Sequence, residues 1–476
     1  MVNELLTRTL TELTSDIRQK KTSPVDLMQA VLGRIDDTHA DLNAVVCMRD
    51  RDALLADART AEARAQRGEA RPLEGIPFGV KDLEDVAGLV TSEGSLPFKD
   101  NVAKHDSVQV ERLKAAGAIV VGKTNAPEFG YTAITKNLVY GVTRSPWHLE
   151  RTPGGSSGGS AAAMAGCVLP LVTSSDGGGS IRIPASFTGC FGLKTSFGRI
   201  PLGPSGLWPY GDTGVYGPTT KTVEDAALFM DQVVGPSPHD PNSLPHPGIS
   251  YQQAIQEPLP AGIRIGYSPD LGYAVVQSDI AAAVEEGVKV FERLGHRVES
   301  LEGGPPQLGL SWGQLGNFWQ AARLHRLLPA HERDFGYTFI AGVKRGWEMT
   351  PETFGELAEA RSRLNDWCTS VFDRFDLLIT PTVPHDPPPA RGPFPGDIEG
   401  RQPNPIAVAS FTIPFNLSWH PAATVRAGLS RAGMPIGLQI VGPRHRDDLV
   451  LRAALAFQRE RPWHPQWPVT WAPLEP

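Results

Sequence analysis

Ser180 follows three consecutive glycines in the stretch SSDGGGSIRI, residues 174–183. The apolar run VLPLV (168–172) precedes this stretch, so the pattern predicts a strand, a tight turn and then a serine. Because glycine has no Cβ, such a turn can aim successive backbone N–H groups into one concavity, as an oxyanion hole requires. Asp176 could brace the turn by accepting backbone N–H groups. The stretch fits a nucleophilic serine, and it fits a glycine-rich turn with an incidental serine equally well.

A serine nucleophile needs a base, and histidine is the usual candidate. The twelve histidines are scattered, and those in apolar context, such as His420, have no evident carboxylate partner. Lys81 is a different candidate, because it ends the apolar run GIPFGV in the sequence GVKD. If burial lowers its pKa, the neutral amine can act as a base near neutral pH. A strand-end lysine could instead keep its ammonium group in water or pair with Asp82.

The segment GGSSG (154–158) matches the pattern G-x-S-x-G at Ser156. That pattern marks a nucleophile elbow when a strand runs into it, but the preceding RSPWHLERTP contains two prolines and no apolar run. No Gly-Lys-Ser/Thr follows, so the same glycines do not predict a phosphate-binding loop. The match at Ser156 is therefore a weak signal by itself.

Short apolar runs and helical stretches alternate along the chain and must position these residues. Buried strands are predicted at IPFGV (76–80), AIVVG (118–122), VLPLV (168–172), IRIGY (263–267), DLLIT (376–380) and PIGLQIV (435–441). Helices are predicted at 107–116, 222–234, 278–294 and 447–459, and Ser23-Pro24 is expected to begin another. This alternation predicts an α/β sheet with helices on its faces. We expect residues 310–372 to form a helical cap or lid, and the proline-rich stretch 385–395 to form a surface loop.

Composition restricts the class of protein further. The 476 residues carry a net charge of −7 and are 41% hydrophobic, which is typical of a globular protein and gives no basic patch for nucleic acid or a membrane surface. No signal-peptide core and no long apolar stretch is visible, so a cytoplasmic location is expected. The four cysteines are widely spaced, and we expect buried free thiols, no metal site and no cofactor.

Several segments together resemble the amidase signature family. They are residues 152–194 with GGSSGG and GGGS, GIPFGVKD (75–82), GKTNAPEFG (122–130) and MPIGLQIVGP (434–443). The resemblance implies an α/β fold in which helices enclose a large mixed twisted sheet of about 10–11 strands. It also implies a single domain over 1–476, with a helical segment at 1–67, a catalytic core at 68–240 and a variable helical cap beside the substrate pocket at 300–375.

The resemblance also implies a Ser–Ser–Lys triad. Ser180 takes the position of the nucleophile, Lys81 that of the general base, and Ser156 that of the bridging serine, which in this family follows or forms a cis peptide bond. Supporting positions fall on Ser157, Asp176 and Arg182, and the oxyanion hole falls on the N–H groups of Gly177, Gly178 and Gly179. Gly177 departs from the family pattern, which more often has Thr, Ile or Ala, and could leave room beside the scissile group.

The substrates implied by the resemblance are small neutral aryl or alkyl amides, cleaved at the C–N bond through an acyl-enzyme, with carbamates and esters as further candidates. GDIEGRQ (396–402) and FTIPFNLS (411–418) look similar to members that cleave aryl amides and aminohexanoate amides. No arginine pair stands out for a substrate carboxylate. The residues expected to bind substrate are Phe129, Gly130, Tyr131, Trp208, Tyr210 and Trp419, although large aromatic residues more often belong to the core.

Two other functions are compatible with the sequence. A glutamine-hydrolysing subunit of a tRNA-dependent amidotransferase would have glutaminase activity and obligatory partner subunits, but residues 206–218 depart from what we expect of one. A binding protein without catalytic activity would leave the three triad positions without a task. For the amidase, we expect a small-molecule amide or carbamate as the binding partner, no nucleic acid or membrane, and a monomer or homodimer.

Overall fold

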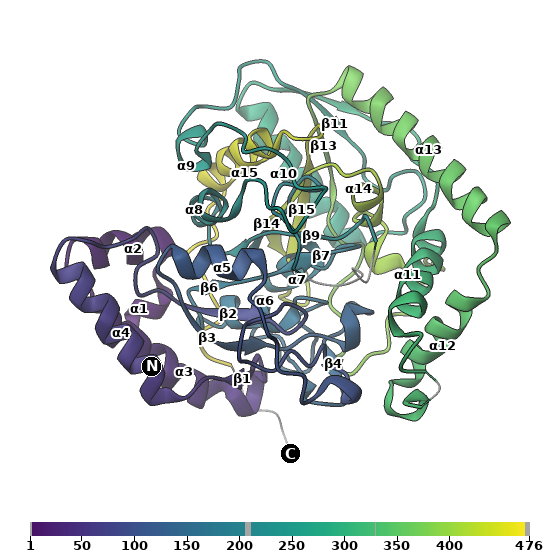
Figure 1. The fold of residues 1–476 in the computed structure, drawn as a ribbon. Coiled ribbons are helices and arrows are strands. Elements are labelled where there is room, and N and C mark those ends of the chain that lie inside the picture. Colours follow the sequence, from purple (N-terminus) through teal and green to yellow (C-terminus); the bar gives the residue numbers. More distant parts are fainter. Residues whose placement is uncertain (1, 205–210, 329, 472–476) are drawn as a thin grey trace.

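The computed structural model describes residues 2–204, 211–328 and 330–471. Two β-sheets occupy the centre, the N-terminal helices lie on one side, and a group of later helices lies on the other (Figure 1). The predicted α/β class is confirmed. Within the described residues, the hydrogen-bonded strands of the centre fall into one sheet of four strands and one of seven.

Four helices form the N-terminal side: α1 (Glu4–Thr7), α2 (Leu10–Arg18), α3 (Pro24–Leu42) and α4 (Arg51–Gln66). Helix α3 begins as predicted, because the Ser23 hydroxyl accepts the N–H groups of Val25 and Asp26, and Pro24 fills the first helical position. Helices α3 and α4 pack against each other, and α4 also contacts β3. These helices cover the outer side of the four-stranded sheet.

The four-stranded sheet has the order β1 (Val45–Met48), β3 (Ile119–Thr124), β2 (Pro77–Lys81) and β6 (Leu171–Val172). Strand β2 runs parallel to both β3 and β6, and α5 (Val108–Ala115) lies in the connection from β2 to β3. Every residue of β2 is buried, as a strand inside a parallel sheet should be. Lys81 is the last residue of β2, so its side chain leaves the sheet at a carboxyl end.

The seven-stranded sheet is mixed. Its order is β10 (Thr219–Thr220), β8 (Phe191–Lys194), β14 (Ala422–Leu429), β15 (Pro435–Val441), β13 (Leu377–Pro381), β11 (Arg264–Tyr267) and β12 (Arg297–Ser300). Strands β13, β11 and β12 are parallel to one another, and the other pairs are antiparallel. Helix α7 (Arg182–Thr188) packs on this sheet, and α10 (Ser278–Arg293) and α15 (Asp447–Glu460) also contact it. Successive residues of β15 face opposite sides of the sheet, and Gly437 lies against α7 whereas Leu438 lies against α10. Helices α7 and α10 therefore cover opposite faces of this sheet.

Two buried helices and a short two-stranded sheet lie at the junction of the two sheets. Helix α6 (Gly158–Ala165) contacts β2, β3 and β6 of the first sheet and also α7, which lies on the second. Every residue of α6 and α7 is buried. The strands β7 (Ser175–Asp176) and β9 (Val215–Tyr216) pair antiparallel just before the three glycines. The segments carrying Ser156 and Ser180 are therefore held at the junction of the two sheets.

The remaining elements are peripheral or short. They are β4 (Lys136–Asn137) and β5 (Gly141–Val142), which pair; α8 (Val223–Val233), α9 (Tyr251–Ala254) and α14 (Ile413–Leu417); and the 3-10 helices η1 (Leu96–Phe98), η2 (Glu128–Gly130), η3 (Glu332–Asp334) and η4 (Ala407–Ala409).

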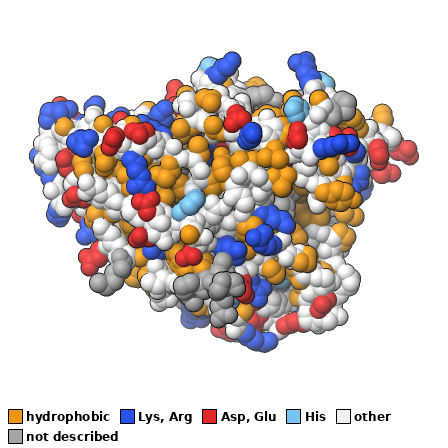
Figure 2. Space-filling view, turned by 90° about the horizontal axis from the view of Figure 1, so that it is seen from below, with side chains coloured by type: hydrophobic (Ala, Val, Ile, Leu, Met, Phe, Trp, Pro, Cys, Tyr) orange, Lys and Arg blue, Asp and Glu red, His pale blue; other side chains and the backbone are white. Residues whose placement is uncertain are grey.

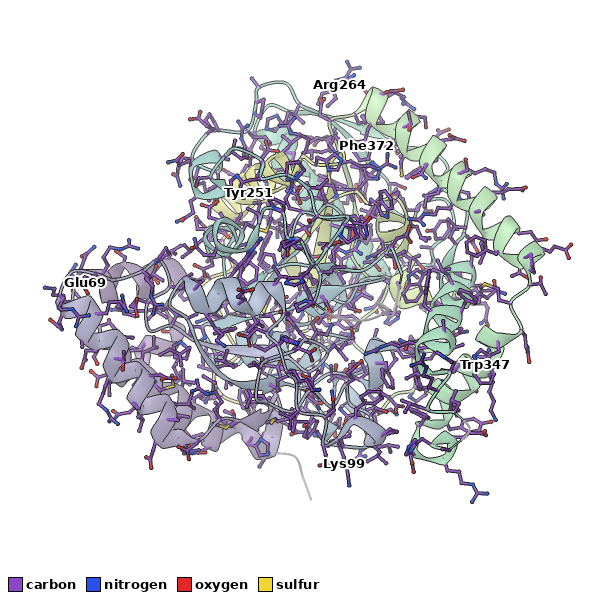
Figure 3. The ribbon with its side chains drawn as sticks, in the orientation of Figure 1. Glu69, Lys99, Tyr251, Arg264, Trp347 and Phe372 are labelled. Atoms are coloured by element: carbon purple, nitrogen blue, oxygen red, sulfur yellow. The ribbon has the colours of Figure 1, made fainter. Side chains whose placement is uncertain are left out.

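Three helices occupy the stretch predicted as a helical cap: α11 (Gly309–Leu324), α12 (Tyr337–Trp347) and α13 (Pro351–Arg374). Helices α11 and α12 pack against each other, whereas Trp347 at the end of α12 lies at the periphery, 56% exposed (Figure 3). We use the name cap for residues 309–374. Whether it opens as a lid stays a prediction.

The prediction of a surface loop at 385–395 is wrong for its first part. Pro384, His385, Pro387 and Pro388 are buried, while the stretch from Arg391 to Phe394 is largely exposed. Hydrogen bonds explain the burial: the Arg151 guanidinium donates to the carbonyl of Pro387, and the Thr152 N–H donates to that of Pro388. The prolines thus lie against the segment that leads to Ser156.

The surface and the cysteines give two further observations. On the face shown in Figure 2, acidic and basic side chains are interspersed with hydrophobic ones. None of the helices in the described ranges has the length and apolar character needed to cross a membrane. The four cysteines are free, as predicted; three are buried and Cys47 is partly exposed.

Candidate active site

Lys81 lies at the centre of a cluster of serine side chains. Its Nζ is 2.9 Å from Ser156 Oγ, 2.8 Å from Ser157 Oγ and 2.9 Å from Ser175 Oγ, and it also donates to the Ser175 carbonyl at 3.2 Å. All these partners are neutral oxygens. Burial lowers the pKa of Lys81 to about 7, although the charges of Asp176 and Glu84 act in the opposite direction. A substantial fraction of the amine is therefore unprotonated at neutral pH.

The two other interpretations of Lys81 do not fit this geometry. The side chain is 1% exposed, so its amine does not lie in water. Asp82 faces other groups: its carboxylate accepts from Ser92 and lies 3.8 Å from the Lys123 amine. Burial raises the pKa of Asp82 to about 6. Asp82 thus belongs to a neighbouring buried polar group, and no carboxylate among the described residues forms an ion pair with Lys81.

Ser156 and Ser157 lie just before α6, and the peptide bond between Gly155 and Ser156 is cis. The Ser157 hydroxyl donates to the Ser175 carbonyl at 3.2 Å, and the Ser157 N–H donates to the Ser180 carbonyl at 3.2 Å. Gly130 lies so close that a Cβ there would be 3.1 Å from Ser156 Oγ. The serine pair is therefore held between the lysine on β2 and the backbone of Ser180.

Ser180 follows the glycines and is partly exposed, whereas the residues around it are buried. It lines a pocket of about 430 Å³ together with Gly178, Trp312 and His385. The hydroxyls of Ser156 and Ser180 do not form a hydrogen bond with each other in this structure, although their segments are joined through the backbone. Catalytic hydrogen bonds are often long or poorly aligned before substrate binds, so the lack of this hydrogen bond is compatible with proton transfer between the two hydroxyls in the substrate complex.

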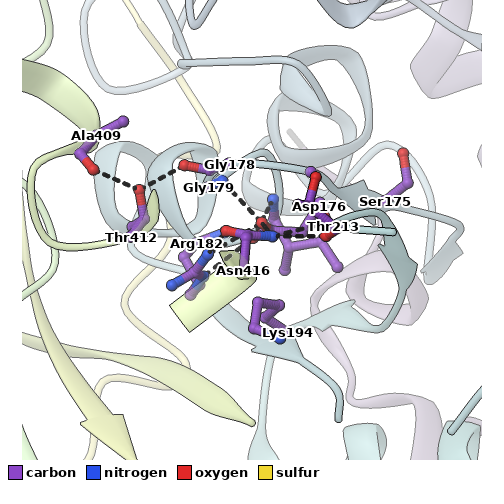
Figure 4. A network of polar contacts seen from close by, with 12 residues as sticks. Ser175, Asp176, Gly178, Gly179, Arg182, Lys194, Thr213, Ala409, Thr412 and Asn416 are labelled. Carbon is purple, nitrogen blue, oxygen red and sulfur yellow. Dashed lines mark hydrogen bonds and ion pairs between the residues drawn. The ribbon is translucent and has the colours of Figure 1, made fainter. Parts of the chain in front are cut away.

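Asp176 and Arg182 form a buried ion pair beneath the glycines (Figure 4). The Asp176 carboxylate accepts the backbone N–H groups of Gly179 at 2.7 Å and Ile181 at 3.1 Å, as the sequence suggested for a brace of this turn. The Arg182 guanidinium donates to both carboxylate oxygens at 3.0 Å. The Arg182 charge and these hydrogen bonds hold the pKa of Asp176 well below its usual range despite complete burial. The carboxylate is therefore ionised and fixes the conformation of the turn.

Three side chains from distant parts of the sequence hold the carbonyl groups of the same turn. The Trp312 indole donates to the Gly177 carbonyl at 2.8 Å, the Thr412 hydroxyl to the Gly178 carbonyl at 2.6 Å, and the Asn416 amide to the Asp176 carbonyl at 3.1 Å. A Cβ on Gly178 would overlap the Trp312 ring, and one on Gly179 would overlap Thr412. The lack of side chains at these two glycines thus lets the clamping groups approach.

Each peptide group is planar, so a carbonyl with a fixed position also fixes the direction of the N–H group of the next residue. This holds for the N–H groups that are predicted to form the oxyanion hole. The Gly179 N–H already donates to Asp176. For the N–H groups of Gly177, Gly178 and Ser180, no acceptor is found among the residues that the structure describes. These three remain available to a ligand oxygen.

The residues predicted to bind substrate are divided between the pocket and other places. Gly130 and Tyr131 line the pocket. Phe129 does not: its fully buried ring stacks on Phe339 with centroids 4.8 Å apart, inside an aromatic cluster behind the pocket. Trp419 also lies elsewhere, because its ring stacks on Phe197 at 4.7 Å and its indole donates to the Asp212 carbonyl. Trp208 and Tyr210 lie outside the described residues.

Sequence reasoning missed His385, Thr412 and Asn416, and it gave Trp312 no role at the turn. The segment FTIPFNLS, which contains Thr412 and Asn416, was noticed for its resemblance but not for these side chains. His385 stood in a stretch interpreted as a surface loop. No local pattern links these residues to Gly177, since the Trp312 contact spans 135 positions of the chain. The described residues contain no group of three His, Cys, Asp or Glu side chains that could hold a metal ion.

Known proteins resemble this chain over nearly its whole length. The family model Amidase matches residues 26–451. An acylamidase of Rhodococcus erythropolis is 35% identical over 95% of both chains. Among solved structures, a bacterial aryl acylamidase of the amidase signature family superposes with a TM-score of 0.92 at 29% identity, covering 99% of this chain and 100% of its own. A 6-aminohexanoate cyclic dimer hydrolase in complex with substrate gives a TM-score of 0.87 at 28% identity, covering 98% and 100%.

A second group of relatives has a different role. One subunit of the glutamyl-tRNA(Gln) amidotransferase of Geotalea daltonii is 30% identical, covering 97% of this chain and 99% of its own. Fold, site and relatives together define a hydrolase that acts on amide C–N bonds. More particularly, the chain belongs to the Amidase family, the amidase signature enzymes.

Proposed function

We propose that this enzyme hydrolyses small neutral amides through an acyl-enzyme on Ser180, with Lys81 as the base and Ser156 as the proton relay. The observation that carries the proposal is the buried Lys81 amine, which contacts serine hydroxyls and carries a pKa of about 7. A neutral amine has a lone pair, so one of the neighbouring hydroxyls can donate to it. Ser156 is suited to this position because its hydroxyl contacts Lys81, and the next residue, Ser157, is bound to the Ser180 carbonyl.

In the first step, Ser180 Oγ attacks the carbonyl carbon of the amide, its proton passes to Ser156, and the Ser156 proton passes to Lys81 Nζ. The oxyanion that forms needs donors fixed in advance. We propose that the N–H groups of Gly177, Gly178 and Ser180 supply them, because the Gly179 N–H is already bound to Asp176. A donor of this kind is worth about 3–4 kcal/mol of transition-state stabilisation.

In the second step the C–N bond breaks, and the proton held by Lys81 returns through Ser156 to the leaving nitrogen. The amine departs and Ser180 carries the acyl group as an ester. A water molecule then attacks this ester and gives its proton to Lys81 through the same path. The C–O bond to Ser180 breaks, the proton returns through Ser156 to Ser180 Oγ, and the acid is released. One lysine therefore serves as base and acid in turn.

The lining of the pocket favours neutral substrates. None of the described residues that line it is Asp, Glu, Lys or Arg, and apolar side chains such as Ile183, Trp312 and Ile406 form much of its wall. A charged substrate group would lose its hydration there without gaining a counter-charge. The acylamidase relatives support amides of apolar acyl or aryl groups, and we extend the proposal to carbamates and esters because their carbonyl groups present the same geometry.

The alternative is hydrolysis of glutamine, which the amidotransferase relatives favour. Glutamine carries an α-ammonium and an α-carboxylate group, and the described pocket offers neither a carboxylate nor a guanidinium to bind them. We therefore rank this function second.

A comparison of five substrate classes tests both proposals: an anilide, an aliphatic amide, a carbamate, an ester and glutamine, each with the wild type and Ser180→Ala. We expect turnover of the anilide and the aliphatic amide, little or none of glutamine, and loss of all turnover in Ser180→Ala. Glutamine as the best substrate would favour the alternative. Full activity of Ser180→Ala would contradict the nucleophile assignment.

A further inference from the structure

His385 is a buried histidine beside the proposed nucleophile that the mechanism does not use. It follows β13, is 4% exposed, and lines the same pocket as Ser180. Its ring lies 6.2 Å from the ring of Phe187 on α7, the helix that begins after Ser180. A titratable ring in a pocket whose other described lining residues carry no charge requires an explanation.

The backbone on both sides of His385 is fixed. The Gln277 N–H donates to the Pro384 carbonyl at 2.9 Å, and the Asp386 N–H donates to the Gln277 side-chain oxygen at 3.2 Å. The next prolines are bound to Arg151 and Thr152, in the segment leading to Ser156. The ring therefore has a defined position relative to the serine cluster, as a group that recognises substrate needs.

The hydrogen bond of Nδ1 determines which nitrogen faces a ligand. Nδ1 lies 2.7 Å from the Asp386 carbonyl, and a carbonyl can only accept, so Nδ1 carries the proton. Burial lowers the pKa of His385 below its ordinary value, despite the opposite effect of Asp386, so the ring is neutral at neutral pH. Nε2 then has a lone pair. No donor to Nε2 is found in the described part of the chain. Nε2 is also absent from the fully buried polar atoms that lack a hydrogen-bond partner, so it is accessible from the pocket.

Two other polar side chains of the pocket are already engaged. The Tyr131 hydroxyl donates to Asn317 at 2.7 Å, and the Asn404 amide donates to the Ser410 hydroxyl at 2.9 Å. His385 therefore offers a strong acceptor in a mainly apolar wall. A buried acceptor left unpaired by a ligand loses its hydration without compensation, which discriminates against ligands that lack a donor.

We propose that His385 selects substrates whose non-reacting part carries a neutral hydrogen-bond donor, such as a hydroxyl, an aromatic amine or a second amide N–H, which donates to Nε2. A cationic donor is disfavoured because the lining contains no carboxylate within the part of the chain that the structure describes. This inference rests on the proposed amidase function and adds a preference for one class of amide. His385 acts here in specificity and takes no part in the transfer of protons to Ser180.

The test uses two pairs of nitroanilide or anilide substrates that differ only in hydroxyl against methyl. One pair varies the end of the acyl chain, and the other varies the para position of the anilide ring. For the pair that reaches His385, we expect the ratio of kcat/KM for hydroxyl over methyl to fall about tenfold in His385→Phe, the size of one hydrogen bond between neutral groups. His385→Gln should keep most of the preference, because its amide oxygen can accept near the position of Nε2.

His420 provides the matched control. It is also a buried histidine, but it stacks on Phe372 at 4.8 Å and does not line the pocket. His420→Phe should leave the hydroxyl-to-methyl ratio unchanged. If His385→Phe leaves the ratio unchanged for both pairs, or slows hydroxyl and methyl substrates equally, the proposal is wrong.

Binding to the inactive Ser180→Ala protein separates this inference from the proposed function. Calorimetric Kd values for the two members of each pair should show the same hydroxyl preference, and the double variant Ser180→Ala/His385→Phe should lose it. Hydroxyl preference in binding without any turnover by the wild type would overturn the amidase proposal alone. Turnover without a His385-dependent preference would overturn the specificity proposal alone.

Discussion

The floor of the site and the cap are built in opposite ways. The floor consists of the serine cluster just before α6 and on β7, the turn before α7, and Lys81 on β2, and all eight residues of α6 are buried. In the cap, α13 has 24 residues, of which only Leu364, Cys368 and Val371 are buried. Apart from Ser180, which is partly exposed, the residues of the floor are buried, whereas most residues of α13 are exposed or half-buried. A substitution should therefore have large effects in the floor, intermediate effects where the two regions meet, and small effects outside them.

Lys81 should show the largest effect, because the proposed chemistry passes through its amine. We expect Lys81→Ala to lower kcat by about 10²–10⁴-fold, the range for loss of a general base. In the wild type, protonation of Lys81 removes the base, so kcat/KM should fall about tenfold per pH unit below its pKa of about 7 and level off above it. Initial rates between pH 5.5 and 9 measure both effects. Recovery of Lys81→Ala by raised pH alone would contradict a base role.

Lys81 also makes a separable prediction about stability. Its pKa is about 7 in the folded protein against 10.5 for the free side chain, so folding releases a proton between these values. The free energy of unfolding should therefore rise with pH across this window. Lys81→Met should reduce that slope in urea unfolding. The slope should not vanish, because burial lowers the pKa of Lys194 to about 7 as well.

Asp176 should show the next largest effect. Asp176→Asn leaves the buried Arg182 guanidinium without its counter-charge and puts an amide group against backbone donors. We expect a loss of about 3–5 kcal/mol in the free energy of unfolding, with a lower kcat because the turn before Ser180 loosens. Asp212→Asn is the control, since the Asp212–Arg361 pair is partly exposed and should contribute no more than about 1 kcal/mol. Equal losses in the free energy of unfolding in the two variants would show that the buried Asp176–Arg182 pair contributes no more to stability than a partly exposed pair.

Trp312 lies where the two regions meet, so its effect should be intermediate. Trp312→Phe keeps a ring beside Gly178 but removes the N–H that holds the Gly177 carbonyl. We expect kcat to fall about three- to thirtyfold with a smaller change in KM, because the lost hydrogen bond positions the oxyanion donors. Trp319→Phe is a matched control on the same helix, because its indole N–H has no partner among the described residues. Comparable losses of kcat in both variants would assign the effect to packing of the cap.

The same contrast explains what the sequence could and could not predict. The strand that ends at Lys81 and the strand before the glycines were predicted, because buried parallel strands appear in a sequence as apolar runs. The turn was predicted because a close approach of two backbones requires glycine. Ser156, Ser157, Asp176 and Arg182 were named from motifs within one short segment, and the structure brings them together around Lys81 and the turn. Trp312 and His385 come from segments without a local signal, and their positions depend on how the cap and the strand β13 pack. Phe129 and Trp419 pack away from the pocket of Ser180, because an aromatic residue near a motif can equally fill the core.

Trp419 should show the smallest effect and sets the outer limit of the site. Its ring is 37% exposed, stacks on Phe197 and lies under the Arg361 guanidinium at 5.4 Å, away from the pocket of Ser180. Trp419→Phe keeps the stacking and loses only the hydrogen bond to the Asp212 carbonyl. We expect a change of about 1 kcal/mol in the free energy of unfolding and less than about twofold in kcat/KM for anilides. A loss of kcat as large as that of Trp312→Phe would place Trp419 in the substrate site and extend the constrained region beyond the floor.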